Sequence, residues 1–175
     1  MRIIAGSRKG ARIFAPKGAG TRPTGDRVRE AAFNLVGPVD GAAVLDLFAG
    51  SGAMGLEALS RGAASAVLVE SDREAVRAIE RNVDKLGLAG VTVVRRDVLQ
   101  ALATDRRAYD LILCDPPYGY AGNERLATYL VRALAPDGLL VYETGVREMP
   151  EIQGLRIRTS RTYGSARLTL LEHEP

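Results

Sequence analysis

The stretch VLDLFAGSGAMG, residues 44–55, has the pattern of a buried strand, a glycine-rich turn and the first turn of a helix. Gly50, Gly52 and Gly55 satisfy the spacing G-x-G-x-x-G, in which glycines let the backbone turn tightly and approach a ligand closely. This spacing is a weak signal by itself, because dinucleotide-binding proteins share it. What it predicts about the fold depends on the elements that follow it.

Strands and helices alternate from this stretch onward. Strands are expected at 43–49, 66–70, 91–97, 109–115 and 139–144, and helices at 51–62, 72–87, 98–104 and 124–134, the last ended by a turn at Pro136-Asp137-Gly138. Continuous apolar runs of this kind are typical of parallel strands buried on both faces. Two β-type runs, 155–164 and 165–174, follow with no helix between them and predict an antiparallel hairpin. The predicted class is α/β, a Rossmann-like, mostly parallel seven-stranded sheet as in class I methyltransferases that use S-adenosylmethionine (SAM).

The residues before the first strand differ in pattern and charge. Short extended runs at 2–5 and 11–15 flank a glycine-bounded turn and predict a β-hairpin, and 26–36 has helical spacing with Asp26 as its N-cap. Residues 1–25 contain six basic residues and no acid, whereas the rest of the chain holds 18 basic and 21 acidic residues. One-sided charge indicates a polyanionic partner, although a solvated basic tail explains it equally well.

Length and composition exclude several classes of protein. The 175 residues suit one domain, and no apolar run approaches the roughly 20 residues of a membrane span. Cys114 is the only cysteine and His173 the only histidine, so a disulfide, a multi-cysteine metal site and a catalytic triad are not expected. His173 is expected in a solvated tail. We expect a cytoplasmic monomer with no metal.

Four acids end successive predicted strands, namely Asp46, Glu70, Asp97 and Asp115. The carboxyl ends of parallel strands share one edge of a sheet, where ligands bind. Asp46 lies four residues before Gly50, where it would repel a pyrophosphate but suit the sulfonium and amino groups of SAM. Glu70 could bind ribose hydroxyls, and Asp97 the adenine amino group. Strand-end acids can also simply cap helices, but that does not explain Asp46, so SAM is favoured over a dinucleotide.

The stretch DPPY (115–118) follows the fourth predicted strand and resembles the [DNS]-P-P-[YF] motif of methyltransferases that act on exocyclic amino nitrogens. A carboxylate and a proline carbonyl can accept the two N–H bonds of such an amino group. Tyr118 can stack on the flat base, worth roughly 1–3 kcal/mol. A plain strand-ending turn is the alternative. Cys114 beside the motif would suit a thiol mechanism on cytosine, but a lone strand cysteine is more often buried and inert.

Longer stretches carry a more specific resemblance. They are RIIAGSRKGARI (2–13), RPTGDRVREAAFNLV (22–36), LDLFAGSGAMGLEALSRGA (45–63) and DPPY (115–118). With these stretches, in this order, the chain resembles the RsmD family of bacterial 16S rRNA guanine-N2 methyltransferases over nearly its whole length. The family usually has a second threonine where Gly25 stands here, so a side-chain cap at this position is not expected, while Asp26 remains.

The resemblance implies transfer of one methyl group from SAM to N2 of guanine 966 in 16S rRNA, within an assembling 30S subunit. It implies a basic N-terminal arm (1–20) on a methyltransferase domain (21–175), with Asp115, Pro116, Pro117 and Tyr118 as catalytic residues. The expected cofactor-binding residues are Asp46, Phe48, Ala49, Gly50, Gly52, Glu70, Ser71, Asp97 and Val98. The expected nucleic-acid-binding residues are Arg2, Arg8, Lys9, Arg12, Lys17, Arg22, Thr24 and Arg27.

Some alternatives stay open at this point. Arg27 and Arg29 could equally be surface helix charges, and the arginines of the last hairpin could bind phosphate or solvent. DPPY recognises an amino group on a flat ring and not which ring, so a DNA adenine or cytosine methyltransferase remains possible, although 175 residues leave little room for a separate recognition domain. A catalytically silent RNA-binding assembly factor is the other alternative.

Overall fold

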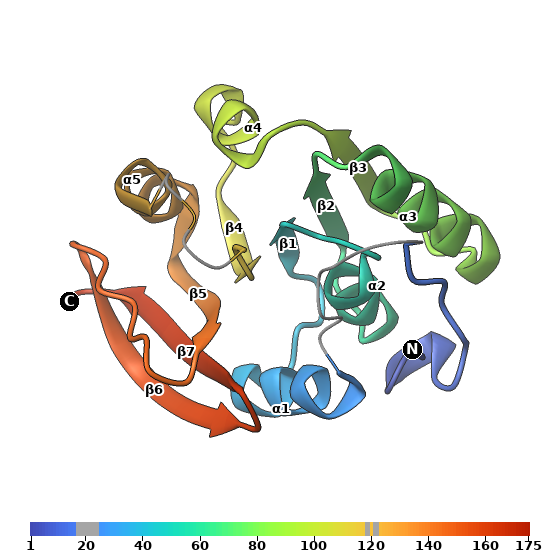
Figure 1. The fold of residues 1–175 in the computed structure, drawn as a ribbon, viewed down its shortest axis with the longest axis horizontal. Helices are drawn as coiled ribbons and strands as arrows, with labels where there is room; N and C mark the ends of the chain where they lie inside the picture. The colour runs from blue at the N-terminus through green and yellow to red at the C-terminus, as the bar shows by residue number, and fades with distance from the viewer. Residues whose placement is uncertain (17–24, 118–119, 121–122) are drawn as a thin grey trace.

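The computed structural model describes residues 1–16, 25–117, 120 and 123–175, which contain a seven-stranded sheet with helices on both faces (Figure 1). The strands are β1 (Ala43–Leu47), β2 (Ser65–Glu70), β3 (Val91–Arg95), β4 (Tyr109–Cys114), β5 (Leu134–Gly145), β6 (Leu155–Tyr163) and β7 (Ala166–His173). The helices are α1 (Asp26–Val36), α2 (Ala53–Ser60), α3 (Arg73–Leu86), α4 (Val98–Thr104) and α5 (Asn123–Ala133), with a 3-10 turn, η1 (Gly6–Arg8). No helix among these described ranges is long and apolar enough to cross a membrane.

The strand order is β3-β2-β1-β4-β5-β7-β6. The first five strands in the chain pair in parallel, while β7 runs antiparallel to both β5 and β6. The second strand of the C-terminal hairpin therefore lies between β5 and the first. This arrangement confirms the predicted fold class, including the terminal antiparallel hairpin.

Two apolar cores lie on opposite faces of the sheet. Neighbouring strand residues point to opposite faces, so Val44 of β1 belongs to one core and Leu45 to the other. Residues from α1, α2, α3 and the N-terminal segment complete the first core, and α4 and α5 complete the second. Figure 1 shows the two groups of helices on opposite sides of the strands.

Three local expectations were wrong. The turn predicted at Pro136 lies inside β5, where the register against β4 shifts between Tyr109 and Leu111, so the irregular residues form a bulge rather than a separate turn. Asp26 is the first residue of α1 and not its cap, because Gly25 occupies the cap position without a side-chain hydrogen bond. His173 ends β7, with its ring 3.0 Å from the carbonyl oxygen of Leu134, rather than in a solvated tail.

The N-terminal segment forms a compact turn with a single antiparallel bridge, Arg2 to Arg12, in place of two full strands. Its chain reversal contains η1, and Ile3 and Ile13 are buried in the first core. The backbone N–H groups of residues 4 and 5 donate to Glu57 of α2 at 2.8 and 3.0 Å. The described part of this segment is therefore packed against the body of the sheet. The division into units at residue 20 stays a prediction.

Arg29 of α1 is buried, so its interpretation as a surface charge was wrong. Its guanidinium lies 3.0 Å from Asp26 and 3.5 Å from Glu57, and it donates to the carbonyl oxygen of Arg2. Glu57 is also bonded by Arg61 at 2.8 Å. A buried guanidinium with these partners joins the N-terminal segment, α1 and α2, which fixes the position of the helix that follows the glycine turn.

Candidate active site

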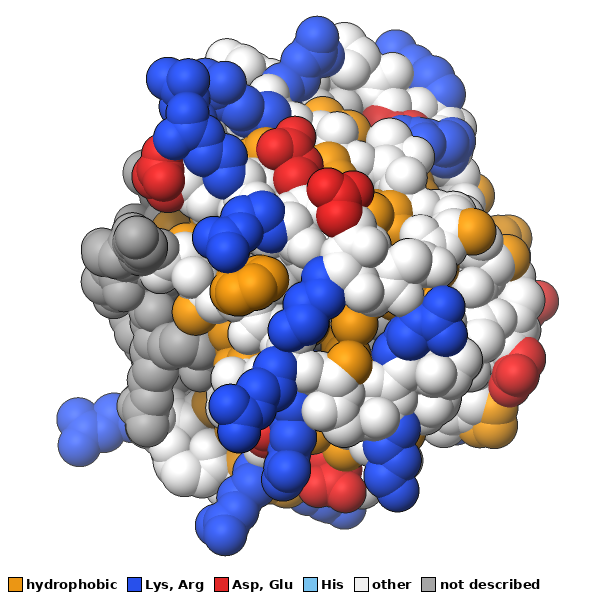
Figure 2. All heavy atoms as spheres, turned by 90° about the vertical axis from the view of Figure 1, so that its right-hand side faces the viewer, with side chains coloured by type: hydrophobic (Ala, Val, Ile, Leu, Met, Phe, Trp, Pro, Cys, Tyr) orange, Lys and Arg blue, Asp and Glu red, His pale blue; other side chains and the backbone are white. Residues whose placement is uncertain are grey.

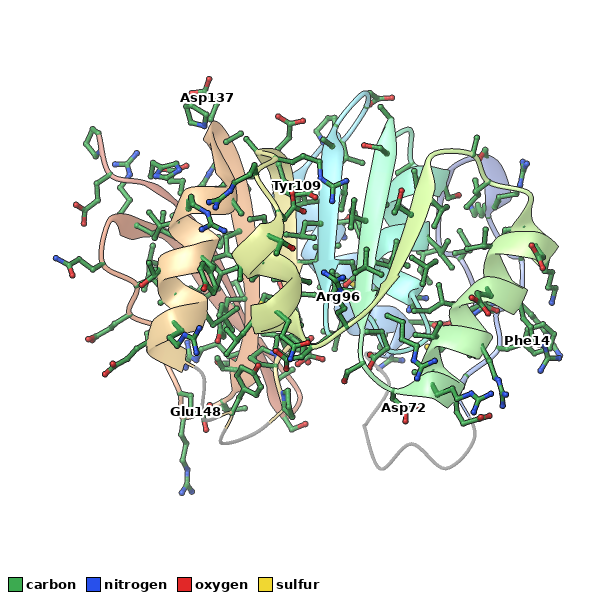
Figure 3. All side chains as sticks on the ribbon, turned by 90° about the horizontal axis from the view of Figure 1, so that it is seen from above. Phe14, Asp72, Arg96, Tyr109, Asp137 and Glu148 are labelled. Atoms are coloured by element: carbon green, nitrogen blue, oxygen red, sulfur yellow. The ribbon has the colours of Figure 1, made fainter. Side chains whose placement is uncertain are left out.

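The carboxyl ends of the parallel strands lie at one edge of the sheet. In Figure 3, Asp72, which follows β2, and Glu148, which follows β5, lie at the lower edge, whereas Tyr109, the first residue of β4, and Asp137 lie at the upper edge. Because β1 to β5 run parallel, the ends of β1, β3 and β4 share the lower edge. This is the edge at which the sequence placed its acids.

Asp46 of β1 is 4% exposed. Its Oδ2 atom accepts a hydrogen bond from the backbone N–H of Gly55 at 2.8 Å. Burial, with smaller contributions from the charges of Asp115 and Glu70, raises the pKa of Asp46 to about 8. The three carboxyl groups are therefore close enough to interact, and a cationic ligand beside them would relieve both the burial and the repulsion.

The glycine-rich turn adopts left-handed backbone at three positions, Phe48 (φ 59°), Gly50 (φ 56°) and Gly52 (φ 76°). A positive φ is uncommon for a residue with a bulky side chain and costs energy. Its presence at Phe48 indicates that the surrounding structure holds the backbone in this conformation, as is common at functional sites. A Cβ at Gly52 would lie 2.8 Å from Cδ2 of Leu68, whereas a Cβ at Gly50 would meet nothing within 4 Å. The turn is thus closely packed behind and open on the side of Gly50.

Glu70, the last residue of β2, holds this turn in place. Its Oε2 atom accepts from the N–H of Gly50 at 2.8 Å, and Oε1 accepts from the N–H groups of Ser71 and Asp72 at 2.8 and 2.9 Å. Each carboxylate oxygen has two lone pairs, so acceptor capacity remains for ribose hydroxyls. Asp72 in turn caps α3 by accepting from Ala75 N at 2.8 Å, as strand-end acids often do.

Asp97 caps α4 by accepting from two backbone N–H groups of that helix at 2.9 and 3.2 Å, and Val98 behind it is buried. Burial, and then the nearby carboxyl group of Asp97, raises the pKa of Tyr120. The ring of Tyr120 meets that of Phe48 edge-on, with centroids 5.1 Å apart. Tyr120, whose role the sequence left open, thus packs on the glycine turn that follows β1 and lies near the acid that follows β3.

Asp115 follows β4 directly. The residue as a whole is exposed, but desolvation of its carboxyl group raises the pKa to about 6. Pro116 is half-buried, and the carbonyl oxygen of Pro117 accepts from the N–H of Tyr120 at 3.1 Å. Tyr118 lies outside the described residues, so its stacking role stays a prediction. An accessible carboxyl beside a proline pair suits the recognition of an amino group.

Cys114 is buried in the second core, as predicted. Burial, together with the nearby charges of Asp115 and Asp46, raises the pKa of its thiol well above the usual value. A thiol of this kind stays protonated at neutral pH and is a poor nucleophile. The thiol mechanism therefore has no support in the structure.

Sequence reasoning missed Tyr142 and Asn82. Burial, and then the neighbouring ionisable groups of Cys114, Glu148 and Asp115, raises the pKa of Tyr142, so this phenol stays neutral beside the site. Asn82 is fully buried, and its amide bonds both the backbone of Phe14 and the carbonyl oxygen of Ser51 in the glycine turn. An amide on the apolar face of an otherwise regular amphipathic helix is the signal that could have identified Asn82.

The expected nucleic-acid residues are only partly described. Arg2, Lys9, Arg12 and Arg27 are exposed. Arg8 is half-buried and has a structural role, because its guanidinium donates to carbonyl oxygens at the end of α3 at 2.5 and 3.3 Å. Lys17, Arg22 and Thr24 lie outside the described residues. Their contacts with nucleic acid stay predictions.

SAM fits the described edge by its chemistry. Asp46 is a buried acid suited to a cation, and the open side at Gly50 lets a ligand approach the backbone. Glu70 and Asp97 offer acceptors for ribose and for an adenine amino group. No group of three or more metal-ligating side chains occurs in the part of the chain described here.

Comparison with known proteins agrees with this arrangement. The family model described as Conserved hypothetical protein 95 matches residues 1–172. YlbH of Bacillus subtilis is 39% identical over 173 residues, 94% of each chain. Ribosomal RNA small subunit methyltransferase D of Escherichia coli K12 is 43% identical over 119 residues, which cover 67% of this chain and 60% of that protein.

The similarity extends to three dimensions. The solved structure of yhhF from Escherichia coli is 32% identical, with a TM-score of 0.90, and the match covers 100% of this chain and 98% of that one. A hypothetical protein of Thermus thermophilus with a solved structure is 34% identical, with a TM-score of 0.83, over 98% and 99% of the two chains. Because the family model spans nearly the whole chain and these relatives share its fold, the chain belongs to the Conserved hypothetical protein 95 family, the RsmD family of rRNA small subunit methyltransferases.

Proposed function

We propose that this chain transfers a methyl group from SAM to the exocyclic N2 of a guanine in 16S rRNA, and that this guanine is position 966. We place the reaction in the cytoplasm, on an assembling 30S subunit, with the enzyme as a monomer. The relatives named ribosomal RNA small subunit methyltransferase D support the reaction class and the RNA. The amino-group target rests on the DPPY stretch.

The observation that carries the proposal is the pair formed by Asp115 and Asp46. One carboxyl is exposed at the end of β4, the other is buried in β1, and their charges interact. Bound SAM would supply an electrophilic methyl group, for which Asp46, Gly50, Glu70 and Asp97 form the binding edge. The accessible acid beside it is where an amino nucleophile can be held.

Asp115 and the carbonyl of Pro116 act on the guanine amino group. Its nitrogen is a poor nucleophile because its lone pair is delocalised into the ring, and two acceptors in fixed positions make the nitrogen more electron-rich and orient it. The proline ring fixes the backbone and offers no competing N–H. A target base has to leave its stack to reach these groups, at a cost of a few kcal/mol. Tyr118 would offset part of that cost by stacking.

Asp115→Ala tests this role. We expect methyl transfer to fall by about 10²–10⁴-fold, because a positioned acceptor is lost at the reacting nitrogen, while SAM affinity changes by less than about threefold. Asp137→Ala, an exposed acid at the opposite edge (Figure 3), is the matched control and keeps full activity. Transfer that survives in Asp115→Ala would reject this residue as the amine acceptor.

The substrate is tested separately. Nucleoside mass spectrometry of 16S rRNA from cells with and without the protein is expected to show one N2-methylguanine that depends on it. Purified protein with SAM and double-stranded DNA is expected to give no methylated adenine or cytosine. Methylated DNA would favour the DNA enzyme, and rRNA that stays unmodified while still bound would favour the silent assembly factor.

A further inference from the structure

We propose that the outer face of α3, together with Phe14 and the adjoining N-terminal segment, is a preorganised surface for the phosphate backbone of rRNA. This inference rests on the proposed function, since it names the surface that would hold the RNA beside the site. The RNA contacts expected from the sequence lie within the first 27 residues, with the arginines of the last hairpin left open, and α3 was not among them.

The outer face of α3 carries a row of cations at four-residue intervals. Arg73, Arg77, Arg81 and Lys85 are all exposed, and this spacing places them on one side of the helix. Like charges four residues apart repel one another, and Arg73 also stands at the positive end of the helix dipole. Of the four cations Arg77 is paired within the helix, with Glu74, and the repulsion within the row favours an anionic partner outside the helix.

Phe14 holds two of these cations in place. The guanidinium carbon of Arg81 lies 4.1 Å from the centre of the Phe14 ring, and Nζ of Lys85 lies 4.9 Å from it. Phe14 is itself fixed, because its N–H and carbonyl bond the buried Asn82 amide at 2.6 and 2.9 Å. Long cationic side chains lose much conformational entropy on binding, and this ring has already restricted two of them.

The N-terminal cations adjoin the same face. Arg8 bonds the carbonyl oxygens at the C-terminal end of α3, and Phe14 bonds Asn82 of the same helix. The exposed Lys9 and Arg12 lie between these two residues in the sequence. Figure 2, which shows this side of the molecule, has Lys and Arg side chains spread across it with fewer acids among them. The surface is thus built from two segments that lie about 60 residues apart in the sequence.

A hollow lies at the end of this surface nearest the active site. It has a volume of about 240 Å³, and its lining includes Arg73, Arg77 and Arg95 with one acid, Glu80. Guanidinium groups around a shallow hollow suit phosphate oxygens. Because α3 begins three residues after Glu70, this end of the row adjoins the ligand edge, and the row leads away from it along the side of the molecule.

Acids on α3 moderate this charge without removing it. Glu74 pairs with Arg77 at 2.5 Å, and Glu80 and Asp84 are exposed beside the row. An RNA phosphate would compete with Glu74 for its arginine. The positive charge of the surface therefore comes from α3 and the N-terminal segment together, although α3 itself also carries acids.

A triple variant tests the surface. Arg77→Ala, Arg81→Ala and Lys85→Ala remove three cations of the row, and Arg156→Ala, Arg158→Ala and Arg161→Ala remove three exposed arginines of β6, the edge strand farthest from β3. Binding to protein-free 16S rRNA is measured from 50 to 300 mM salt. We expect the α3 variant to lower the slope of log affinity against log salt by about 2, and affinity by about ten- to hundredfold, because three phosphate contacts are lost.

SAM affinity serves as the folding control and stays within about twofold in both variants. The β6 variant is expected to keep the wild-type slope. Phe14→Leu keeps an apolar side chain but removes the ring, so we expect binding about two- to fivefold weaker with the slope unchanged. An unchanged slope in the α3 variant, or an equal loss in the β6 variant, overturns the proposal. Binding to anionic lipid vesicles is measured as well. If the α3 variant loses vesicle binding but keeps wild-type rRNA binding, the proposal is also overturned.

Failure of the proposed function has a different outcome. If wild-type protein leaves 16S rRNA unmethylated but the α3 variant still loses slope, the surface stands and the reaction is wrong. If wild-type protein methylates the rRNA and the α3 variant binds as well as wild type, the reaction stands and the surface is wrong.

Discussion

Glu57 and Asp46 are two buried carboxylates whose surroundings differ. Glu57 is fully buried in α2 and accepts hydrogen bonds or ion pairs from Arg29, Arg61 and two backbone N–H groups. Asp46 is nearly as buried in β1, yet a backbone N–H of Gly55 is its hydrogen-bond donor, and its pKa is raised. Both carboxylates are associated with α2. Glu57 is a residue of this helix, and Asp46 accepts a hydrogen bond from its Gly55.

The difference separates structure from function. A buried carboxylate surrounded by hydrogen-bond donors and cations links the segments that supply them. Removal of one partner then leaves an uncompensated buried charge and destabilises the fold. A buried acid with too few partners weakens the free protein and is kept because a ligand completes it. We therefore assign Glu57 to the stability of the fold and propose that Asp46 belongs to the ligand site. The predictions below separate these two roles.

Glu57→Gln has the largest expected effect. The substitution keeps the shape but removes the fully buried carboxylate that pairs with both Arg29 and Arg61, and Arg29 keeps the partly exposed Asp26 as a carboxylate partner. We therefore expect the free energy of unfolding to fall by about 3–5 kcal/mol. For a chain of this length that lowers Tm by roughly 6–20 °C. Thermal and urea unfolding measure it.

Glu74→Gln is the matched control, because Glu74 forms a half-exposed surface pair with Arg77. Its effect on unfolding is expected to stay within about 0.5 kcal/mol. SAM binding by folded Glu57→Gln protein at low temperature is expected to match wild type within about twofold. If Glu57→Gln is as stable as the control, Glu57 is not the structural member of the pair.

Asp46→Asn is expected to act in the opposite direction on stability. The folded pKa of about 8 lies above the ordinary value of 3.8, so the unfolded chain ionises first as pH rises. Stability contributed by this group is therefore present below about pH 4 and is lost progressively up to about pH 8. Asparagine does not ionise, so we expect the variant to be more stable than wild type at pH 8, by on the order of 2 kcal/mol.

The same variant is expected to bind SAM about 10–100-fold more weakly, because a charge-assisted interaction is lost. Denaturant unfolding at pH 5 and pH 8, together with calorimetric titration of SAM, measures both effects. A variant that is both less stable and unimpaired in binding would reverse the roles assigned to Asp46 and Glu57.

A smaller effect is expected in the pH dependence of SAM binding. A cation next to Asp46 lowers its pKa, so binding near pH 7 releases a proton and affinity rises with pH until about pH 8. Below that pH the limiting change is about tenfold per pH unit. Calorimetry in buffers of different ionisation enthalpy measures the number of protons released on SAM binding. The same measurement on Asp46→Asn gives the part that comes from the titration of SAM itself. Equal proton release by both proteins would exclude Asp46 as its source.

The sequence identified Asp46 as a candidate ligand-binding acid but gave no role to Glu57. Asp46 could be found because it interrupts an apolar strand just before a glycine turn, and a carboxylate there has few structural uses. Arg29 lies in an amphipathic helix, where charges are usually solvated. Glu57 lies in α2, which is buried along nearly its whole length. Their pairing depends on how these two helices and the N-terminal segment pack. Local pattern likewise predicted a turn at Pro136, where pairing with β4 instead extends β5 through a bulge.

Gly55→Ala perturbs the hydrogen-bond donor of Asp46 and has the smallest expected effect. A Cβ there would lie 3.1 Å from Oδ2 of Asp46 and 3.1 Å from Leu68, so the acid or its neighbour must shift by a few tenths of an ångström. The better helix propensity of alanine, about 1 kcal/mol, offsets this crowding, so net stability is expected to change by less than about 1 kcal/mol. SAM affinity is expected to fall about threefold to tenfold, and the pH at which affinity levels off is expected to rise, because Asp46 becomes less accessible to solvent.

Gly25→Ala, where a Cβ meets nothing within 4 Å, is expected to leave SAM binding unchanged. If Gly55→Ala binds SAM like wild type but unfolds several kcal/mol more easily, the contact between Asp46 and α2 is structural, and the contrast with Glu57 is lost.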